Sequence, residues 1–336
     1  MLIHVKTEQD GYDILIERGA LAKAHEYLDL QRKCFIVTDD GVPASYAEAI
    51  ANQCKEAVLE IVPQGEASKS MKVLEGLLAT MMEKGFTRGD CVIAVGGGMV
   101  GDLAGFAAAS YMRGVDFYNI PTTVLSQADS SIGGKTAVNL GKVKNIVGAF
   151  HQPRFVLIDP NTLDTLPQRQ YSAGLAELIK SGLIGNPSLF ERFEETEDGA
   201  DIEELLAASL NVKKAIVEED EKEHGVRKLL NLGHTLGHGI ESVTGLLHGE
   251  SVALGMIPMC GEKTAERLIK LLEHYNLPVS VDADEDAVVD AVLHDKKGKG
   301  DAITAVFADE PGECRFADID EDEIRQRLQI ILDRKG

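Results

Sequence analysis

The first half of the chain alternates short apolar runs with segments whose apolar residues recur at helical spacing. Runs rich in β-branched and other apolar residues at Cys34–Thr38, Val58–Val62 and Cys91–Val95 predict buried strands. Tyr46–Glu56 and Lys69–Lys84 have apolar positions three and four residues apart and predict helices. Strands that alternate with helices of this length favour a largely parallel, doubly wound sheet.

The second half has a different pattern, in which long helical periodicities dominate from Gln170 onward. The helical ranges are Tyr171–Leu183, Ile202–Glu219, His234–Val243 and Ser251–Tyr275, and only Ala302–Phe307 is clearly strand-like. Turn-forming residues at Asp164–Pro167 end the α/β pattern. We therefore expect an α/β domain over residues 1–167 and a mainly helical domain over residues 168–336.

Charge and composition exclude some classes of function. The 336 residues include 55 acidic and 34 basic side chains, which gives a formal net charge of −21 and argues against coating nucleic acid or an anionic membrane. No run approaches the ~18 apolar residues of a membrane span, and the N-terminus lacks the apolar region of a signal peptide. The five cysteines are far apart and form no C-x-x-C pair. We expect a soluble protein of the cytoplasm.

A glycine-rich segment follows the strand predicted at Cys91–Val95. Gly96, Gly98 and Gly101 satisfy the pattern G-x-G-x-x-G and open a helix of small residues, where backbone N–H groups can bind a pyrophosphate. The usual dinucleotide fold places this motif after the first strand and an acid at the end of the next one. Here several strands precede the motif, and Asp116 opens the next strand. We favour a nucleotide phosphate site of unusual topology over the alternative, a tight strand–helix turn.

A second segment stands out by its charge. Ser130–Ile158 contains no Asp or Glu but four cations, namely Lys135, Lys142, Lys144 and Arg154. It is preceded by Asp129, and Asp129–Thr136 reads as a flexible polar loop that carries a lysine. Such loops hold phosphates through backbone N–H groups and a point charge. The alternative is an ordinary solvated loop.

Three of the nine histidines lie close together in the sequence, at His234, His238 and His248. His234 and His238 are four residues apart and share one helix face. Two neutral imidazoles and a carboxylate suit Zn²⁺ and leave an open position for a substrate. Spacing alone leaves open which two histidines bind, and which carboxylate joins them among Glu177, Glu241 and Glu250.

Cations on the same predicted helices add to this picture. Lys180 lies three residues after Glu177, and Lys213 and Arg227 follow on later segments. Each alone is most simply a member of a surface ion pair. Together with the histidines, they indicate a pocket for an anion beside a metal.

These motifs together resemble the 3-dehydroquinate synthase family, over roughly residues 35 to 300. The segments that carry the resemblance are Gly96–Phe106, Tyr111–Gly114, Pro121–Thr123, Asp129–Thr136, Lys144–Phe150, Ala173–Lys180, Asn231–His238 and His248–Glu250.

The resemblance implies a lyase of the shikimate pathway of aromatic amino-acid biosynthesis. It would convert 3-deoxy-D-arabino-heptulosonate 7-phosphate into 3-dehydroquinate and phosphate, through transient oxidation by NAD, phosphate elimination, re-reduction and aldol closure. The resemblance also implies NAD and a divalent metal (Zn or Co) as cofactors, an active site between the two domains, and a homodimer. The alternatives are a related cyclase that makes 2-deoxy-scyllo-inosose or valiolone, a metal-dependent polyol dehydrogenase, and a non-catalytic NAD-binding protein.

Matching motifs carry functional residues onto this chain. The resemblance implies three metal ligands, Glu177, His234 and His248. It places at the cofactor Gln64, Gly65, Glu66, Ala67, Ser68, Lys69, Gly97, Gly98, Met99, Val100, Gly101, Asp102, Thr122, Thr123, Lys135, Lys144, Thr162, Leu163, Asp164 and Thr165. It places around the substrate Asp129, Lys135, Asn145, Lys180, Lys213, Arg227, Asn231, His238, Lys296 (favoured over Lys297) and, from a neighbouring subunit, Arg113. Gln170 stands where the family often has a glutamate near the cofactor.

Overall fold

The structure is a computed structural model that describes residues 1–8, 11–141, 143–195, 201–295 and 303–332. The chain divides into two compact units, Met1–Leu166 and Pro167–Gly336. Among the described residues, no helix combines the length and the apolar character needed to cross a bilayer.

The first unit is built on a seven-stranded sheet with the order β1-β2-β9-β6-β5-β3-β4. Its strands are β1 (Leu2–Val5), β2 (Tyr12–Ile16), β3 (Lys33–Asp39), β4 (Glu56–Val62), β5 (Cys91–Gly96), β6 (Asp116–Pro121) and β9 (Phe155–Ile158). The pair β1 and β2 is antiparallel, and every other neighbouring pair in this sheet is parallel. The predicted α/β fold with a largely parallel sheet is confirmed.

Short helices connect these strands. They are η1 (Ala20–Glu26), α1 (Ala44–Ala51), η2 (Glu66–Ser68), α2 (Met71–Glu83), α3 (Gly98–Ser110), η3 (Tyr111–Arg113), the π-helical turn η4 (Ser126–Ser130) and η5 (Pro160–Thr165). The α2 helix begins where the Ser70 side chain accepts a hydrogen bond from the backbone N–H of Val73. The α1 helix ends at Ala51, five residues before the predicted end at Glu56, because the chain turns there to enter β4.

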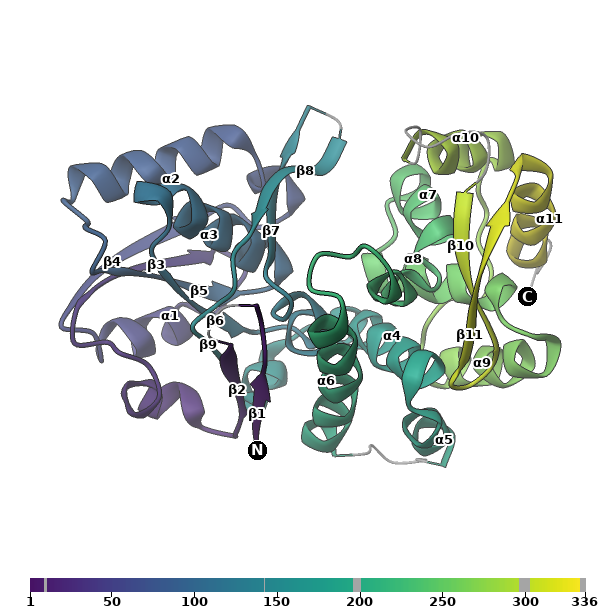
Figure 1. Cartoon of the computed structure of the whole chain (residues 1–336), viewed down its shortest axis with the longest axis horizontal. Helices are drawn as coiled ribbons and strands as arrows, with labels where there is room; N and C mark the ends of the chain where they lie inside the picture. The colour runs from purple at the N-terminus through teal and green to yellow at the C-terminus, as the bar shows by residue number, and fades with distance from the viewer. Residues whose placement is uncertain (9–10, 142, 196–200, 296–302, 333–336) are drawn as a thin grey trace. The chain divides into compact units, whose positions relative to one another are not determined.

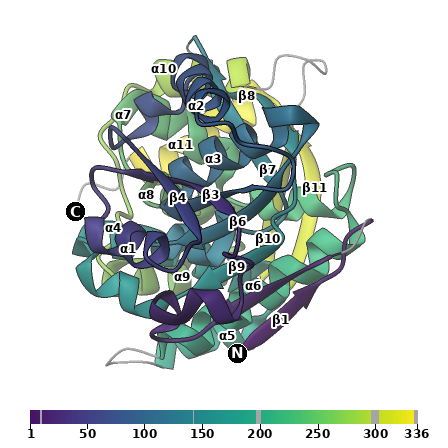
Figure 2. The same cartoon turned by 90° about the vertical axis from the view of Figure 1, so that its left-hand side faces the viewer.

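The two faces of the sheet are covered by different helices. Phe35 and Val37 of β3 pack in a core with α2 and α3, whereas Cys34 and Ile36 pack in a second core with α1. Figures 1 and 2 show α2 and α3 on one side of the sheet and α1 on the other. The helices that follow β3 and β5 therefore lie on opposite faces, and the chain reverses its direction across the sheet between these two neighbouring strands.

A separate antiparallel hairpin follows η4 in the sequence. Its strands are β7 (Lys135–Leu140) and β8 (Val143–Phe150), with a register shift between Val138 and Leu140. Figure 1 shows the hairpin extending past the sheet of the first unit. The loop predicted at Asp129–Thr136 is confined to Ser131–Gly134, between η4 and β7. It is buried and not flexible, and the Tyr12 hydroxyl accepts a hydrogen bond from the Gly133 N–H at 3.0 Å.

The second unit is mainly helical, as predicted. Its elements are α4 (Gln168–Gly185), α5 (Pro187–Glu195), α6 (Ile202–Glu219), η6 (Val226–Asn231), α7 (His234–Thr244), α8 (His248–Met256), η7 (Ile257–Met259), α9 (Glu262–His274), α10 (Glu285–Asp295), α11 (Glu321–Leu332) and a hairpin of β10 (Ile303–Glu310) and β11 (Glu313–Ile319). The single helical pattern at Ser251–Tyr275 is divided into α8 and α9, since Pro258 cannot donate a backbone hydrogen bond in a helix interior. The strand β11 was missed by the sequence prediction.

Candidate active site

Most of the segments predicted to bind a cofactor lie along one edge of the sheet in the first unit. Gln64–Lys69 follow β4, Gly97–Asp102 follow β5, Thr122 and Thr123 follow β6, and Thr162–Thr165 lie after β9. The strands β9, β6, β5, β3 and β4 are successive and parallel in the sheet. All four segments are therefore at the carboxyl edge, where open α/β sheets bind ligands.

The point at which the chain reverses direction, between β3 and β5, is where such sheets place a bound ligand. Gly96 ends β5, and Asp39 ends the neighbouring strand β3. Burial raises the pKa of Asp39, although the carboxylate accepts a hydrogen bond from the Gly41 N–H at 2.8 Å. Asp39 was not predicted, because the usual dinucleotide fold has its acid after the glycine motif in the sequence. In the sheet, the partner of β5 is a strand that comes earlier in the chain.

The glycine motif combines tight packing with an open helix end. The first backbone bond of α3 runs from the Gly101 N–H to the Gly97 oxygen at 3.1 Å, which leaves the N–H groups of Gly98, Met99 and Val100 before it. A Cβ at Gly98 would lie 2.9 Å from the Ser130 hydroxyl oxygen. The close approach explains the glycine, and the helix N-terminus suits the phosphate of a nucleotide.

A polar cluster connects two of the predicted cofactor segments and the hairpin. Lys69 is buried, with 5% exposure, and its Nζ contacts the carboxylate of Asp102 and the side-chain oxygen of Asn145. Asn145 has a left-handed backbone conformation with φ of 55°. Lys135 and Lys144 are exposed on the hairpin.

Other predicted residues of the first unit lie in different surroundings. Thr162 is part of the core, since its hydroxyl donates to the Asp159 oxygen and accepts from Gln127 Nε2 at 3.0 Å. Arg113 is exposed in a strained turn, with φ of 49° at Met112 and 70° at Arg113. Sequence patterns gave no indication of this strain.

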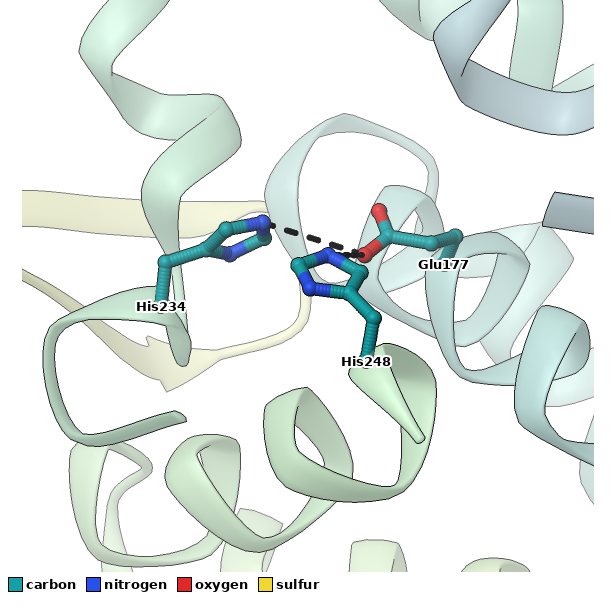
Figure 3. A group of neighbouring side chains, drawn as sticks. All are labelled: Glu177, His234 and His248. Carbon is teal, nitrogen blue, oxygen red and sulfur yellow. Dashed lines mark ion pairs between the residues drawn. The ribbon is translucent and has the colours of Figure 1, made fainter. Parts of the chain in front are cut away.

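A compact group of metal-type ligands lies in the second unit. One ligand atom each from Glu177, His234 and His248 lies within 4.8 Å of the others (Figure 3). The Nε2 atoms of His234 and His248 lie 3.9 and 3.7 Å from the same Glu177 oxygen. This is the arrangement of a three-ligand metal centre with an open position.

The far side of each imidazole is fixed by a second contact. The backbone oxygen of Leu232 lies 3.1 Å from His234 Nδ1, and a Glu241 oxygen lies 3.0 Å from His248 Nδ1. A carbonyl oxygen only accepts, so Nδ1 of His234 carries the proton and Nε2 keeps its lone pair. Metal-binding histidines are typically held in this way.

The three carboxylates that spacing could not separate have different roles. Glu177 is 1% exposed and faces both imidazoles, whereas Glu241 contacts the outer nitrogen of His248. Glu250 forms a bidentate ion pair with Arg169 at 2.6 and 2.7 Å and accepts a hydrogen bond from the Leu247 N–H. Glu250 therefore stabilises the start of α8 and is turned to other partners than the imidazoles.

Electrostatics at the cluster favour a charged Glu177 and a neutral His234, whereas His248 must lose a proton to bind a metal. Burial would raise the pKa of Glu177, but the charge of Lys180 and the two histidines outweigh it and hold that pKa well below its ordinary value. Burial and Lys180 hold the pKa of His234 well below its ordinary value, so this imidazole is neutral. Burial would also lower the pKa of His248, but Glu177 and Glu241 raise it to about 9.

The buried carboxylate and the two imidazoles fit a divalent cation. Both side-chain oxygens of Glu177 are buried, and within the described part of the chain neither accepts a hydrogen bond of normal geometry, although Lys180 forms an ion pair with one of them. A buried carboxylate oxygen that accepts no hydrogen bond is costly. Because it faces two imidazole nitrogens, a Zn²⁺ or Co²⁺ ion would satisfy it.

Glycines bring the ligand-bearing helices together. A Cβ at Gly249 would lie 1.8 Å from the Ala173 oxygen, so α8 and α4 touch one turn before Glu177. Gly233, with φ of 79°, precedes His234 and starts α7 in a left-handed conformation that favours glycine. The spacing of the ligands therefore depends on backbone contacts that no larger residue would allow.

Three buried cations lie on neighbouring elements of the second unit, and one of them, Lys180, contacts Glu177 of the cluster. Lys180, Lys213 and Arg227 are all buried, on α4, α6 and η6, elements that pack against one another. Asn231 Nδ2 donates to Glu223 at 3.2 Å, and Glu223 has a strained φ of 62°. Glu223 was not predicted from the sequence, and it is a candidate for orienting the Asn231 side chain.

The remaining predicted residues fall into two groups. His238 is exposed beside the other two imidazoles, with ring centroids 5.2 Å from His234 and 5.8 Å from His248. Asp129 lies in η4, next to the serine that packs on Gly98. Lys142, Lys296 and Lys297 lie outside the described residues.

A parallel sheet with a glycine turn at its reversal point, and a Glu–His–His cluster on buried helices, are typical of an enzyme that uses a nucleotide and a metal. Comparison with known proteins agrees. The chain matches family models described as 3-dehydroquinate synthase N-terminal, over residues 59–173, and 3-dehydroquinate synthase C-terminal, over residues 174–298. A 3-dehydroquinate synthase from Enterococcus faecalis is 40% identical over 360 aligned residues, which cover 100% of this chain and 99% of that protein. The chain belongs to the 3-dehydroquinate synthase family.

Solved structures of related cyclases share the fold. A 2-epi-5-epi-valiolone synthase from Streptomyces hygroscopicus with NAD⁺ and Zn²⁺ bound has a TM-score of 0.88 and 27% identity, covering 98% of this chain and 99% of that one. A 2-deoxy-scyllo-inosose synthase complexed with carbaglucose-6-phosphate, NAD⁺ and Co²⁺ has a TM-score of 0.87 and 25% identity, with the same coverage.

Proposed function

We propose that the chain is a carbon–oxygen lyase of the shikimate pathway that converts 3-deoxy-D-arabino-heptulosonate 7-phosphate into 3-dehydroquinate and phosphate. Similarity to 3-dehydroquinate synthases over the whole chain supports this substrate over those of the other cyclases. The observation that carries the proposal is the buried Glu177 carboxylate, which faces the Nε2 atoms of His234 and His248.

Glu177, His234 and His248 would hold the divalent metal, which we propose to be Zn²⁺ or Co²⁺. When bound, such a cation polarises substrate hydroxyl oxygens and favours their deprotonation. The chain contributes the geometry, because Leu232 and Glu241 fix the ring orientation of the two histidines.

The carboxyl edge of the sheet would hold NAD. Bound NAD⁺ accepts a hydride from a substrate alcohol and later returns it, so the overall reaction has no net redox change. The N–H groups at the start of α3 would bind the pyrophosphate, and Asp39 and Glu66 would bind ribose hydroxyls as hydrogen-bond acceptors. The other predicted cofactor residues after β4, β6 and β9 would line the same edge.

The substrate carries a phosphate and a carboxylate, and the buried cations of the second unit suit them. Lys180, Lys213 and Arg227 are desolvated before substrate arrives, so they would bind an anion without first losing a water shell. His238 and Asn231 would contribute hydrogen bonds, and so would Asp129, Lys135, Asn145 and Lys296. The strained turn at Met112 and Arg113 would present the Arg113 guanidinium to the phosphate of a substrate bound in a neighbouring subunit.

We also propose that the protein is a homodimer of the cytoplasm. The hairpin exposes Leu140, Val143 and Ile146 at 54%, 54% and 61%, an apolar surface that favours association. All five cysteines are free thiols, which fits a reducing compartment.

The test follows phosphate release from the heptulosonate phosphate with purified protein, a trace of NAD⁺ and Zn²⁺ or Co²⁺. We expect many turnovers per NAD⁺ and no accumulation of NADH. Glucose 6-phosphate and a heptulose phosphate without the carboxylate serve as the comparison substrates. Faster phosphate release from either of these would assign the chain to another cyclase, and stoichiometric NADH would identify a dehydrogenase.

A further inference from the structure

Asn139 lies on β7 at the point where the hairpin meets the segment after β4. Its backbone N–H donates to the Lys69 oxygen at 2.8 Å, and it forms a parallel bridge with Ser70. The register shift of the hairpin, between Val138 and Leu140, falls at the same residue. The backbone of Asn139 is therefore fixed to the segment that carries Glu66 and Lys69.

The side-chain amide of Asn139 acts both as a hydrogen-bond donor and as an acceptor. Its Nδ2 donates to the Glu66 carboxylate at 2.8 Å, and its Oδ1 accepts the backbone N–H of Asn145 at 2.8 Å. A side chain that serves both partners must carry a donor and an acceptor a few ångströms apart, as a primary amide does. Asp would keep the acceptor and lose the donor, and Ala would lose both.

Asn145 depends on this contact for its conformation. Its φ of 55° is uncommon for a residue other than glycine, and Asn139 holds its N–H while Lys69 Nζ holds its side-chain oxygen. Across the part of the chain that the structure describes, Asn145 Nδ2 donates to no residue. The contacts thus fix two of its polar groups and leave its amide donor available for a ligand.

We propose that Asn139 is a positioning residue that sets Glu66 and Asn145 in register with each other through its side-chain amide. It touches neither ligand itself. The proposal rests on the proposed function, which assigns Glu66 to NAD and Asn145 to the substrate. Because one amide serves both segments, the two binding surfaces are fixed by a single side chain.

The decisive variant is Asn139→Asp, since it reverses one contact and keeps the other. The new carboxylate still accepts the Asn145 N–H, but it repels the Glu66 carboxylate in place of donating to it. We expect NAD affinity, measured by calorimetry or fluorescence, to fall about tenfold, equivalent to about 1.4 kcal/mol. The KM for the sugar phosphate should change less than about threefold.

A double-mutant cycle with Glu66→Gln separates this role from general damage. In the Glu66→Gln background, the amide at residue 66 can donate to a carboxylate at residue 139 as readily as it accepts from the Asn139 amide. We expect Asn139→Asp to cost less than about twofold in NAD affinity there, so the cycle should show coupling of about fivefold or more. Equal losses in the two backgrounds would overturn the contact with Glu66.

Asn139→Ala tests the second half of the proposal. It removes the acceptor of the Asn145 N–H as well, so the KM for the sugar phosphate should rise about tenfold together with the loss of NAD affinity. Asn52→Asp, at the exposed end of α1, is the matched control and should leave both values within about twofold.

Each outcome has one meaning for Asn139. Wild-type values for both Asn139 variants would exclude a positioning role, and loss of secondary structure in Asn139→Asp would show a structural one. The failure of the proposed function would look different. The wild-type protein would then release no phosphate, while the NAD-binding cycle would still report on Asn139 and Glu66.

Discussion

The cofactor edge of the first unit and the metal cluster of the second are built by different means. The edge consists of segments after parallel strands, with a helix N-terminus and exposed side chains such as Lys135 and Lys144. The cluster consists of side chains on packed helices, and Glu177 and Lys180 are almost fully buried there. The first site therefore depends mainly on backbone position, and the second on side-chain identity and on the closeness of the helices. Changes at one site should leave the other intact.

Removal of a metal ligand should have the largest effect on metal affinity and almost none on NAD affinity. In His248→Ala, we expect metal affinity to fall at least about fiftyfold, because three or four ligands share a binding free energy of roughly 10–16 kcal/mol, about 2.5 kcal/mol or more for each. NAD affinity should stay within about twofold. Competition with a chromogenic chelator measures metal affinity, and calorimetry measures NAD affinity. His274→Ala, on the exposed face of α9, is the control. Retained metal affinity would remove His248 from the ligand set.

A change of backbone spacing in the second unit should come next. In Gly249→Ala, the new Cβ would lie 1.8 Å from the Ala173 oxygen, so α8 must move away from α4. We expect the free energy of unfolding in urea to fall by about 2–3 kcal/mol, and metal affinity to fall with it. Gly76→Ala, in α2, meets nothing within 4 Å and should stabilise the protein by up to about 1 kcal/mol. Similar urea unfolding curves for Gly249→Ala and Gly76→Ala would contradict the close contact between α8 and α4.

Loss of the charge behind His248 should have a moderate effect. Glu241→Gln keeps an acceptor for Nδ1 but removes the negative charge, and we expect metal affinity to fall about tenfold. The absorption bands of bound Co²⁺ should shift slightly, because the ligand set is kept. Glu273→Gln, which is exposed on α9, is the control. An unchanged affinity would show that Glu241 does not tune the imidazole.

The smallest expected effect lies at the cofactor edge. Gly98→Ala places a Cβ 2.9 Å from the Ser130 hydroxyl oxygen, which can turn away at some cost. We expect NAD affinity to fall about tenfold or less, and metal affinity to be unchanged. In Gly89→Ala the nearest atom is at 3.8 Å, so NAD affinity should not change. A loss of metal affinity in Gly98→Ala would break the comparison between the two sites.

Sequence patterns predicted an element best where its signals were local, such as a cap residue and regular apolar spacing along one helix face. The predicted helix at Ile202–Glu219 has the bounds of α6. Its Asp201 cap and its regular apolar spacing are local signals. The range Ser251–Tyr275 was wrong as one helix because the apolar period continues through Pro258, where the chain breaks.

Contacts between distant segments could not be predicted in the same way. Asp39 became a candidate only when the sheet order placed β3 beside β5. The different roles of Glu177, Glu241 and Glu250 depend on how α4, α7 and α8 pack, and the three residues look equivalent in the sequence. Spacing identifies the residue types of such a site, and the tertiary structure assigns each one its partner.

The burial of α4 has a consequence for the life of the protein in a cell. Every residue from Ser172 to Ile184 is buried, and this run includes the charged pair of Glu177 and Lys180. A metal that binds only the folded chain adds about 2.7 kcal/mol to the free energy of unfolding at a hundredfold excess over its Kd. Degradation that acts on unfolded chains should then be slower when the metal is plentiful. The supply of the metal would thereby set how much enzyme is kept, in addition to how much of it is active.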